Sequence, residues 1–111
     1  MARQDTLGGF ELIVLLAVMR LRDEAYGVPI ARAIEESSGR AVALGSVYAA
    51  LERLEEKNFV RSTWGDPTAE RGGRARRYFR VTAAGREKAR EMQQTLVALW
   101  RGLPEMKGGR A

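Results

Sequence analysis

Residues 44–58, LGSVYAALERLEEKN, have the apolar spacing of an amphipathic helix, and this helix constrains the fold of the whole chain. At about 100° per residue, Val47, Ala50, Leu51 and Leu54 fall on one stripe that would face a protein core. A helix that only fills a core has little reason to begin with Gly-Ser and to carry a tyrosine beside its buried stripe. That tyrosine could also be an ordinary boundary residue, so the neighbouring segments must decide. The positions on the other faces of the helix are Ser46, Tyr48, Ala49, Arg53 and Glu56.

A second helical pattern precedes this helix and predicts a helix-turn-helix. Tyr26-Gly27-Val28-Pro29 opens it, because proline is tolerated in a first turn, where its missing N–H costs no hydrogen bond. Gly39 is the expected end, since glycine accepts the left-handed conformation. Two short helices joined by a brief linker are typical of helix-turn-helix proteins, in which the second helix reads DNA. The pattern alone is weakly specific. The expected inward positions of the earlier helix are Tyr26, Ile30, Ala33 or Ile34, and Ser37.

After Asn58 the apolar period changes from 3.6 to 2, which predicts a β-hairpin. Residues 59–64 have the pattern of one strand and residues 75–81 that of its antiparallel partner. The polar segment 65–74, GDPTAERGGR, is rich in turn residues and would connect them. A hairpin directly after a reading helix is the wing of a winged-helix domain.

The positive charge of the chain is concentrated in this hairpin. Residues 59–80 hold six arginines and two carboxylates, so they carry four of the five net positive charges. Such a cationic loop suits an anionic partner such as DNA phosphates, and paired glycines let the backbone approach a duplex closely. The alternative is that the basic loop only aids solubility. The candidate DNA contacts in the hairpin are Arg71, Gly72, Gly73, Arg74, Arg76 and Arg77.

Two further helices, at the ends of the chain, carry more apolar surface than one small domain can cover. Residues 10–21 include eight consecutive apolar residues, far below the ~20 needed to cross a bilayer. Thr82 is the expected N-cap of a last helix over residues 83–103, ~30 Å long, whose apolar seam Val97 widens. We therefore expect a homodimer, although this helix could instead fold back entirely onto residues 10–21 within one subunit. The expected interface residues are Phe10, Leu12, Met92, Leu96, Leu99, Trp100 and Leu103.

The predicted fold class is mainly α with a small β component (α+β): a winged helix-turn-helix with an N-terminal helix and a C-terminal dimerisation helix. Residues 1–6 would form a flexible arm with no targeting signal, residues 7–82 the DNA-binding domain, residues 83–103 the dimerisation helix and residues 104–111 a flexible tail.

The composition excludes several classes of function. The chain has no cysteine and no histidine, which excludes disulfides, thiolate or imidazole zinc sites and histidine-assisted nucleophiles. The carboxylates are scattered and no glycine-rich phosphate loop follows a strand, so we expect no enzyme, no cofactor and no metal site. A cytoplasmic protein without a membrane association fits this composition.

Several motifs in one order resemble the PadR-like transcriptional regulators. They are Ala25-Tyr26-Gly27, Gly45-Ser46-Val47-Tyr48 and Arg71-Gly72-Gly73-Arg74, within LGGFELIVLLAVMRL, DEAYGVPIARAIEE, LGSVYAALERLEEKNFVRS and WGDPTAERGGRARRYFRVT, followed by Gly85. The resemblance covers roughly residues 7–103. Phe59 follows Asn58 where the family commonly has glycine, and asparagine also accepts the left-handed conformation.

The resemblance implies a winged helix-turn-helix protein that binds an inverted-repeat operator as a dimer, usually as a repressor. It places the third helix in the major groove and Tyr48 near the DNA backbone. Arg71, Arg74 and Arg76 would follow the flanking groove. The terminal helices of two subunits would interlock.

The short C-terminal part of the chain resembles a compact subgroup of this family. Members that respond to phenolic acids often have a larger C-terminal domain, whereas in a multidrug-binding member of the compact subgroup a tryptophan of the last helix stacks on flat ligands. Trp100 could bind a small planar aromatic molecule in the same way. The competing interpretation is that Trp100 is ordinary dimer core.

The expected mechanism separates affinity from specificity. Arginines that neutralise phosphates would provide affinity that falls with salt, and Ser46, Ala49 and Arg53 would provide specificity together with groove shape. Two reading helices would meet half-sites ~34 Å apart. The rival hypotheses are a winged-helix protein-protein interaction module without DNA binding, and an RNA-binding protein, which would lack the usual exposed aromatic platform.

Overall fold

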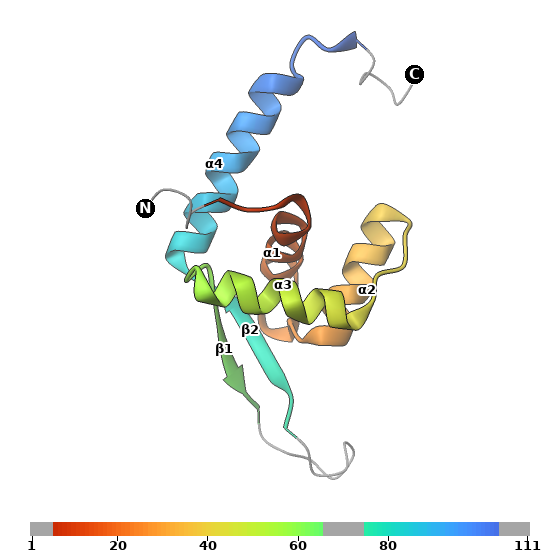
Figure 1. The fold of residues 1–111 in the computed structure, drawn as a ribbon, viewed down its shortest axis with the longest axis vertical. Helices are drawn as coiled ribbons and strands as arrows, with labels where there is room; N and C mark the ends of the chain where they lie inside the picture. The colour runs from red at the N-terminus through yellow and green to blue at the C-terminus, as the bar shows by residue number, and fades with distance from the viewer. Residues whose placement is uncertain (1–5, 66–74, 105–111) are drawn as a thin grey trace.

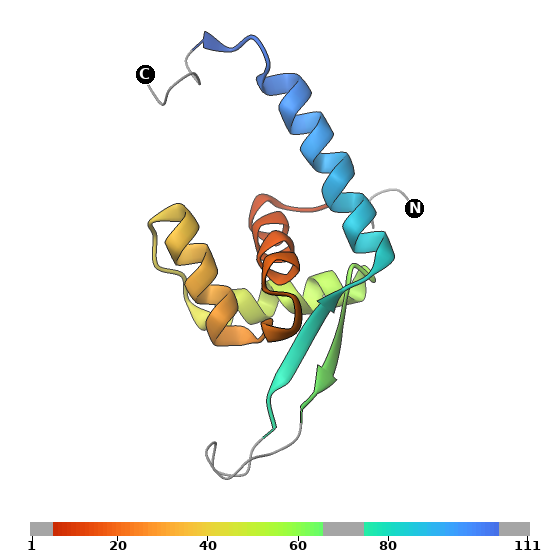
Figure 2. The same cartoon turned by 180° about the vertical axis from the view of Figure 1, so that it is seen from behind.

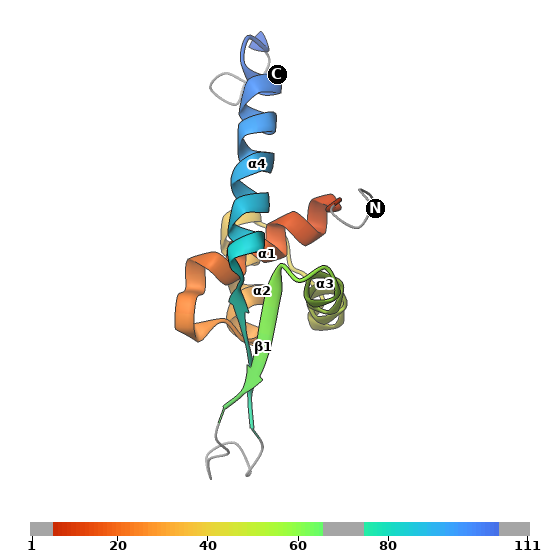
Figure 3. The ribbon, with the colours of Figure 1, turned by 90° about the vertical axis from the view of Figure 1, so that its left-hand side faces the viewer.

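The computed structural model describes residues 6–65 and 75–104 and has the winged-helix architecture that the sequence predicts (Figure 1). Three helices pack into one body, and a two-stranded antiparallel hairpin and a last helix leave that body in opposite directions (Figure 1 and Figure 3). The elements in chain order are α1 (Gly9–Leu21), the 3-10 helix η2 (Arg22–Glu24), α2 (Gly27–Ser38), α3 (Leu44–Glu56), β1 (Val60–Trp64), β2 (Arg77–Val81) and α4 (Ala83–Trp100).

Helix α1 is the centre of the core and contacts α2, α3, β2 and α4 (Figure 2). Its long apolar run allows this, because a helix that is apolar on more than one side can be covered by several neighbours. The stripe predicted for α3 is confirmed, since all four of its residues are completely buried. The largest fully buried side chains are Val14, Leu15, Val18, Ile30, Val47, Leu51, Leu54, Val60 and Phe79.

Helix α2 begins and ends as expected, and its predicted inward residues Ile30 and Ile34 are buried. Pro29 lies in the first turn, and Gly39 ends the helix with φ 75° and donates its N–H to Glu35 O. The predicted inward position Ser37 is wrong, because it is exposed, whereas Ala31 is buried. The neighbouring Ser38, also exposed, donates its hydroxyl to Ile34 O at 2.7 Å, so the last turn of the helix carries polar side chains at the surface.

The hairpin is shorter than predicted at both strands. Phe59 donates its N–H to Leu54 O and so completes the end of α3, while its carbonyl oxygen accepts the N–H of Thr82, the residue after β2. Asn58 has φ 68°, the left-handed conformation expected of it, and turns the chain from helix to strand. The register pairs Val60 with Val81 and Trp64 with Arg77.

Helix α4 starts at the predicted N-cap and ends three residues before the predicted limit. The Thr82 side chain accepts a hydrogen bond from Gly85 N at 2.9 Å, which confirms the cap. The helix ends at Trp100, and Gly102 with φ 87° then reverses the chain. The apolar spacing reaches Leu103, but the left-handed glycine prevents the helix from continuing to it.

Most of the α4 seam is exposed within one subunit. Leu96 is 39% exposed, Trp100 48% and Leu99 70%, while only Gly85 and Ala89 of this helix are buried. The alternative in which the helix folds back entirely onto α1 is therefore wrong. Within the described residues, no helix combines the length and the apolar character that crossing a membrane requires.

Candidate nucleic-acid interface

The outer face of α3 is open to solvent, as a reading helix requires. Gly45, Ser46 and Ala49 are exposed, and the side chain of Arg53 is 50% exposed. These residues lie opposite the buried stripe that fixes the helix to the core. The first half of α3 carries only small side chains on this face, so a partner could approach its backbone closely.

Tyr48 lies half-buried between α2 and the hairpin. Its ring centroid lies 6.4 Å from that of Phe79 in β2. On its other side the ring lies against Gly27, where an added Cβ would be only 2.7 Å from Tyr48 Cζ. Glycine at this position therefore makes room for the ring. This contact explains in part why Tyr26-Gly27 and Tyr48 occur together in the sequence.

A buried carboxylate from α1 contacts the second half of α3. Among the described residues, Glu11 is the only buried charged residue, with 7% of its surface exposed. Its Oε2 accepts a hydrogen bond from Arg53 Nε at 2.6 Å, and its Oε1 accepts one from Lys57 Nζ at 2.7 Å. Burial alone would raise the pKa of Glu11, but the hydrogen bonds from Lys57, Arg53 and Gly8 N outweigh it and lower the pKa below its ordinary value.

Arg77 joins the hairpin to α3 within the protein. Its guanidinium donates to Glu52 at 2.7 Å and to Glu55 at 2.8 Å, and these bonds, the one to Glu52 above all, raise the pKa of Arg77. Glu55 also accepts from the backbone and side chain of Ser62. A DNA contact by Arg77 stays a prediction, and it would require exchanging these carboxylates for phosphates. The same pairs offset the acidic character of the end of α3.

Of the remaining predicted wing residues, the structure describes only Arg76. Arg71, Gly72, Gly73 and Arg74 lie outside the described residues. The Cζ of Arg76 lies 4.2 Å from the ring centroid of Tyr26, a cation–π contact. Tyr26 in turn packs edge-to-face with Tyr78, with ring centroids 5.3 Å apart. Arg76 therefore lies at the junction of the hairpin and α2.

Two more arginines lie on the outward face of the hairpin, where the sequence analysis did not single them out. Arg61 and Arg80 are cross-strand partners, and both are exposed. Like charges directly opposite each other destabilise a hairpin unless an anion or a carboxylate lies between or beside them. Arg80 has one such carboxylate, Asp23, at 3.4 Å, in a pair that is largely solvated.

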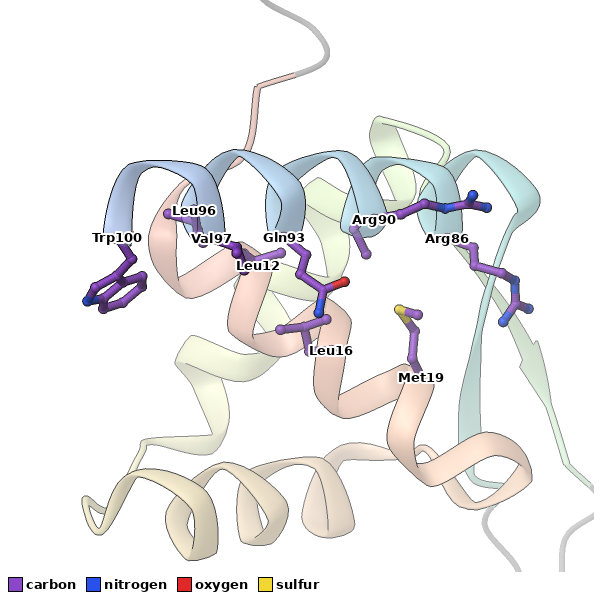
Figure 4. Close-up of a pocket in the computed structure, with 10 residues that line it drawn as sticks. Leu12, Leu16, Met19, Arg86, Arg90, Gln93, Leu96, Val97 and Trp100 are labelled. Carbon is purple, nitrogen blue, oxygen red and sulfur yellow. The ribbon is translucent and has the colours of Figure 1, made fainter. Parts of the chain in front are cut away.

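A groove of about 430 Å³ separates α4 from α1 (Figure 4). Trp100 lies at one end of it and Arg86 at the other, with Leu16 between them (Figure 4). Of the predicted interface residues, the groove brings together Leu12, Leu96 and Trp100, whereas Phe10 and Met92 are half-buried outside its lining. Leu16, Met19, Gln93 and Val97 also line it and were not among the predicted interface residues.

The family model for transcriptional regulators of the PadR-like family matches residues 15–91, from the second half of α1 through β2 to the first half of α4. This chain belongs to that family. The assignment agrees with the fold, because the matched region contains both the helix-turn-helix and the hairpin. PadR-like proteins are transcriptional regulators and not enzymes, so the interface described above belongs to a regulator.

Individual proteins are similar to this PadR-like chain over different lengths. A PadR family transcription regulator from Clostridium difficile R20291 superposes with a TM-score of 0.71 at 25% identity, over 90% of this chain and 100% of that chain. An uncharacterised protein X of Lysinibacillus sphaericus is 28% identical over 83% of each chain. An uncharacterised 37.1 kDa protein in a transposon of Streptomyces fradiae is 45% identical over 56% of this chain, but that match covers only 16% of the longer protein.

Among the described residues of this PadR-like chain, no group of three or more metal-binding side chains is close enough to hold an ion. The sequence-based predictions also missed Glu11, although its signal was available, since it is the one carboxylate within the apolar run from Phe10 to Met19.

Proposed function

We propose that this PadR-like regulator binds an inverted-repeat operator in double-stranded DNA as a homodimer and represses transcription by covering a promoter. The observation that carries the proposal is the exposed outer face of α3 beside an arginine-rich hairpin. α3 is anchored by a fully buried stripe, so it can enter a major groove without losing its place in the core. A protein that acts on cellular DNA in this way would work in the cytoplasm.

The contacts to DNA fall into two groups. Ser46, Ala49 and Arg53 on α3 would meet base edges and nearby phosphates, with Tyr48 close to the backbone. The wing residues would follow the flanking phosphates or the minor groove, where cations give affinity that depends on salt. They are Arg71, Gly72, Gly73, Arg74, Arg76 and Arg77.

The apolar surface of α4 favours a second copy of the chain as partner. Leu99, the most exposed of its seam residues at 70%, would cost free energy if it stayed in water. The groove between α1 and α4 offers an apolar surface of the same chain beside it. We propose that two copies bury these surfaces together through Phe10, Leu12, Met92, Leu96, Leu99, Trp100 and Leu103.

A small planar aromatic effector is part of the proposal, and it depends on Trp100. This ring is 48% exposed at one end of the groove, where a flat molecule could stack on it. In a Trp64→Phe variant, Trp100 is the only tryptophan, so its fluorescence reports on that end directly. Quenching by flat aromatic dyes with release of DNA would support an effector site, and quenching without release would contradict it.

Selection of bound duplexes from a random pool at moderate salt tests the DNA-binding proposal. We expect a two-fold symmetric consensus with half-sites about one turn apart, ~34 Å. A matched selection with Arg71, Arg74 and Arg76 changed to alanine should recover weaker binders with a shallower salt dependence. If the unchanged protein enriches no duplex, the chain is instead a winged-helix protein-protein interaction module, and the proposal fails.

A further inference from the structure

The side chain of Glu11 in α1 contacts α3 and accepts a hydrogen bond from one edge of the Arg53 guanidinium. It lies in the first turn of α1, 42 residues before Arg53 in the chain. Its two oxygens accept from Arg53 Nε, Lys57 Nζ and Gly8 N, at 2.6, 2.7 and 3.1 Å. Three donors on a side chain that is 9% exposed fix the carboxylate in one orientation.

The bond to Glu11 uses only one of the arginine's donor groups. Arg53 donates through Nε, and its two terminal nitrogens have no partner among the described residues. Half of the side chain is exposed. Because the guanidinium is planar and rigid, fixing Nε also fixes the direction of both terminal amino groups. An arginine held in this way loses less rotamer entropy when it binds an acceptor.

The charge balance leaves Arg53 available to DNA. One carboxylate, Glu11, faces two cations, and the second cation, Lys57, is also bound to Thr6 O at 2.6 Å. These three side chains together therefore keep one net positive charge. Glu11 does not cancel the attraction to a polyanion, and it restricts the direction from which Arg53 can bind one.

We propose that Glu11 is a positioning residue that orients Arg53 toward its acceptor on the operator, so that a side chain of α1 sets the sequence discrimination of α3. The inference rests on the proposed DNA-binding function and deepens it. It assigns the discrimination to a pair, Glu11 and Arg53, where the sequence singled out only the arginine. Glu11 itself touches no DNA.

A double-mutant cycle tests this role, with the ratio of affinities for the selected operator and for an unrelated duplex as the readout. Glu11→Gln removes a negative charge, so it should raise affinity for the unrelated duplex, which a simple electrostatic role would do for both duplexes equally. Positioning predicts in addition that the ratio falls about fivefold or more, the size of one well-made arginine contact. In an Arg53→Ala background, Glu11→Gln should not change the affinity ratio any further.

Lys57→Ala is the matched control, because it removes the other cation on Glu11 and leaves the Arg53 bond in place. Its ratio should stay within about twofold of the unchanged protein. The inference is overturned if Glu11→Gln keeps the full ratio, or if it lowers the ratio equally in the Arg53→Ala background. An unchanged protein that shows no preference for any duplex would instead overturn the proposed function.

Glu11→Asp provides a second route if Glu11→Gln does not fold, which circular dichroism would reveal. It keeps the charge on α1 but is one methylene too short for the 2.6 Å bond to Arg53 in the present helix packing. The expected result is again a lower ratio, now without the rise in affinity for the unrelated duplex. A full ratio with Glu11→Asp would contradict the inference.

Discussion

Replacing Gly85 with alanine should disrupt the packing of the first turn of α4 against Phe59 and Val81, which sets the direction of this helix. In this structure an added Cβ would overlap the carbonyl oxygen of Phe59 and lie 2.9 Å from Val81 Cγ2. That carbonyl also accepts the Thr82 N–H at 3.0 Å, at the start of the helix. The backbone must therefore move, and a flexible side chain cannot relieve the overlap.

The expected loss of stability is about 2 kcal/mol. Overpacking of this kind costs ~1–3 kcal/mol, and the loosened Thr82 bond adds about 1 kcal/mol. Alanine in a helix recovers about 1 kcal/mol relative to glycine. With an unfolding entropy of ~2.1 cal/mol/K per residue, the midpoint Tm should fall by roughly 9 °C.

Thermal unfolding followed by circular dichroism measures this change, at equal protein concentration because self-association would raise Tm. Gly45→Ala in α3 is the matched control, since an added Cβ there meets no atom within 4 Å. It should leave Tm unchanged or raise it. The packing argument is refuted if Gly85→Ala unfolds within about 2 °C of the unchanged protein, where ~9 °C is expected.

Three further outcomes follow from the same structure. Because the pKa of Glu11 is lowered in the folded chain, the Glu11 carboxylate should stabilise the fold fully above the unfolded pKa of about 4.3, and this stabilisation should disappear as pH falls through the folded pKa. In urea unfolding, Glu11→Gln should therefore be less stable than the unchanged protein at pH 7 and nearly as stable as it at pH 3. Leu99→Glu should separate a dimer without unfolding the subunit, since the site is exposed, whereas Gln94→Glu should not; equal sedimentation of the two variants would contradict the proposed interface. Arg76→Ala should reduce the slope of log K against log salt by about 0.9 if Arg76 contacts one phosphate, and an unchanged slope would remove it from the wing contacts.

The sequence predicted the parts of this fold that depend on local chemistry. The apolar spacing of α3 identified its buried stripe, and Gly39, Asn58 and Thr82 marked turns and caps that the structure confirms. These features depend on residues within a few positions of one another. A single sequence therefore contains the information needed to predict them.

The contacts between distant elements were not predictable in the same way. The Glu11–Arg53 pair and the Arg77 pairs join residues 22 to 42 positions apart, and a charge pattern does not say which partners will meet. The end of α4 was also missed, because the apolar spacing continues past Trp100 while Gly102 turns the chain. Glu11 was the detectable exception, since a lone carboxylate in an apolar helix needs a buried partner.

The stoichiometry of the complex with a selected duplex tests the central claim most directly. Sedimentation of the protein with a duplex that carries the inverted repeat should give two chains per duplex. A duplex that carries a single half-site should bind the protein far more weakly. A monomer that binds all duplexes with equal affinity, or none, would contradict the account.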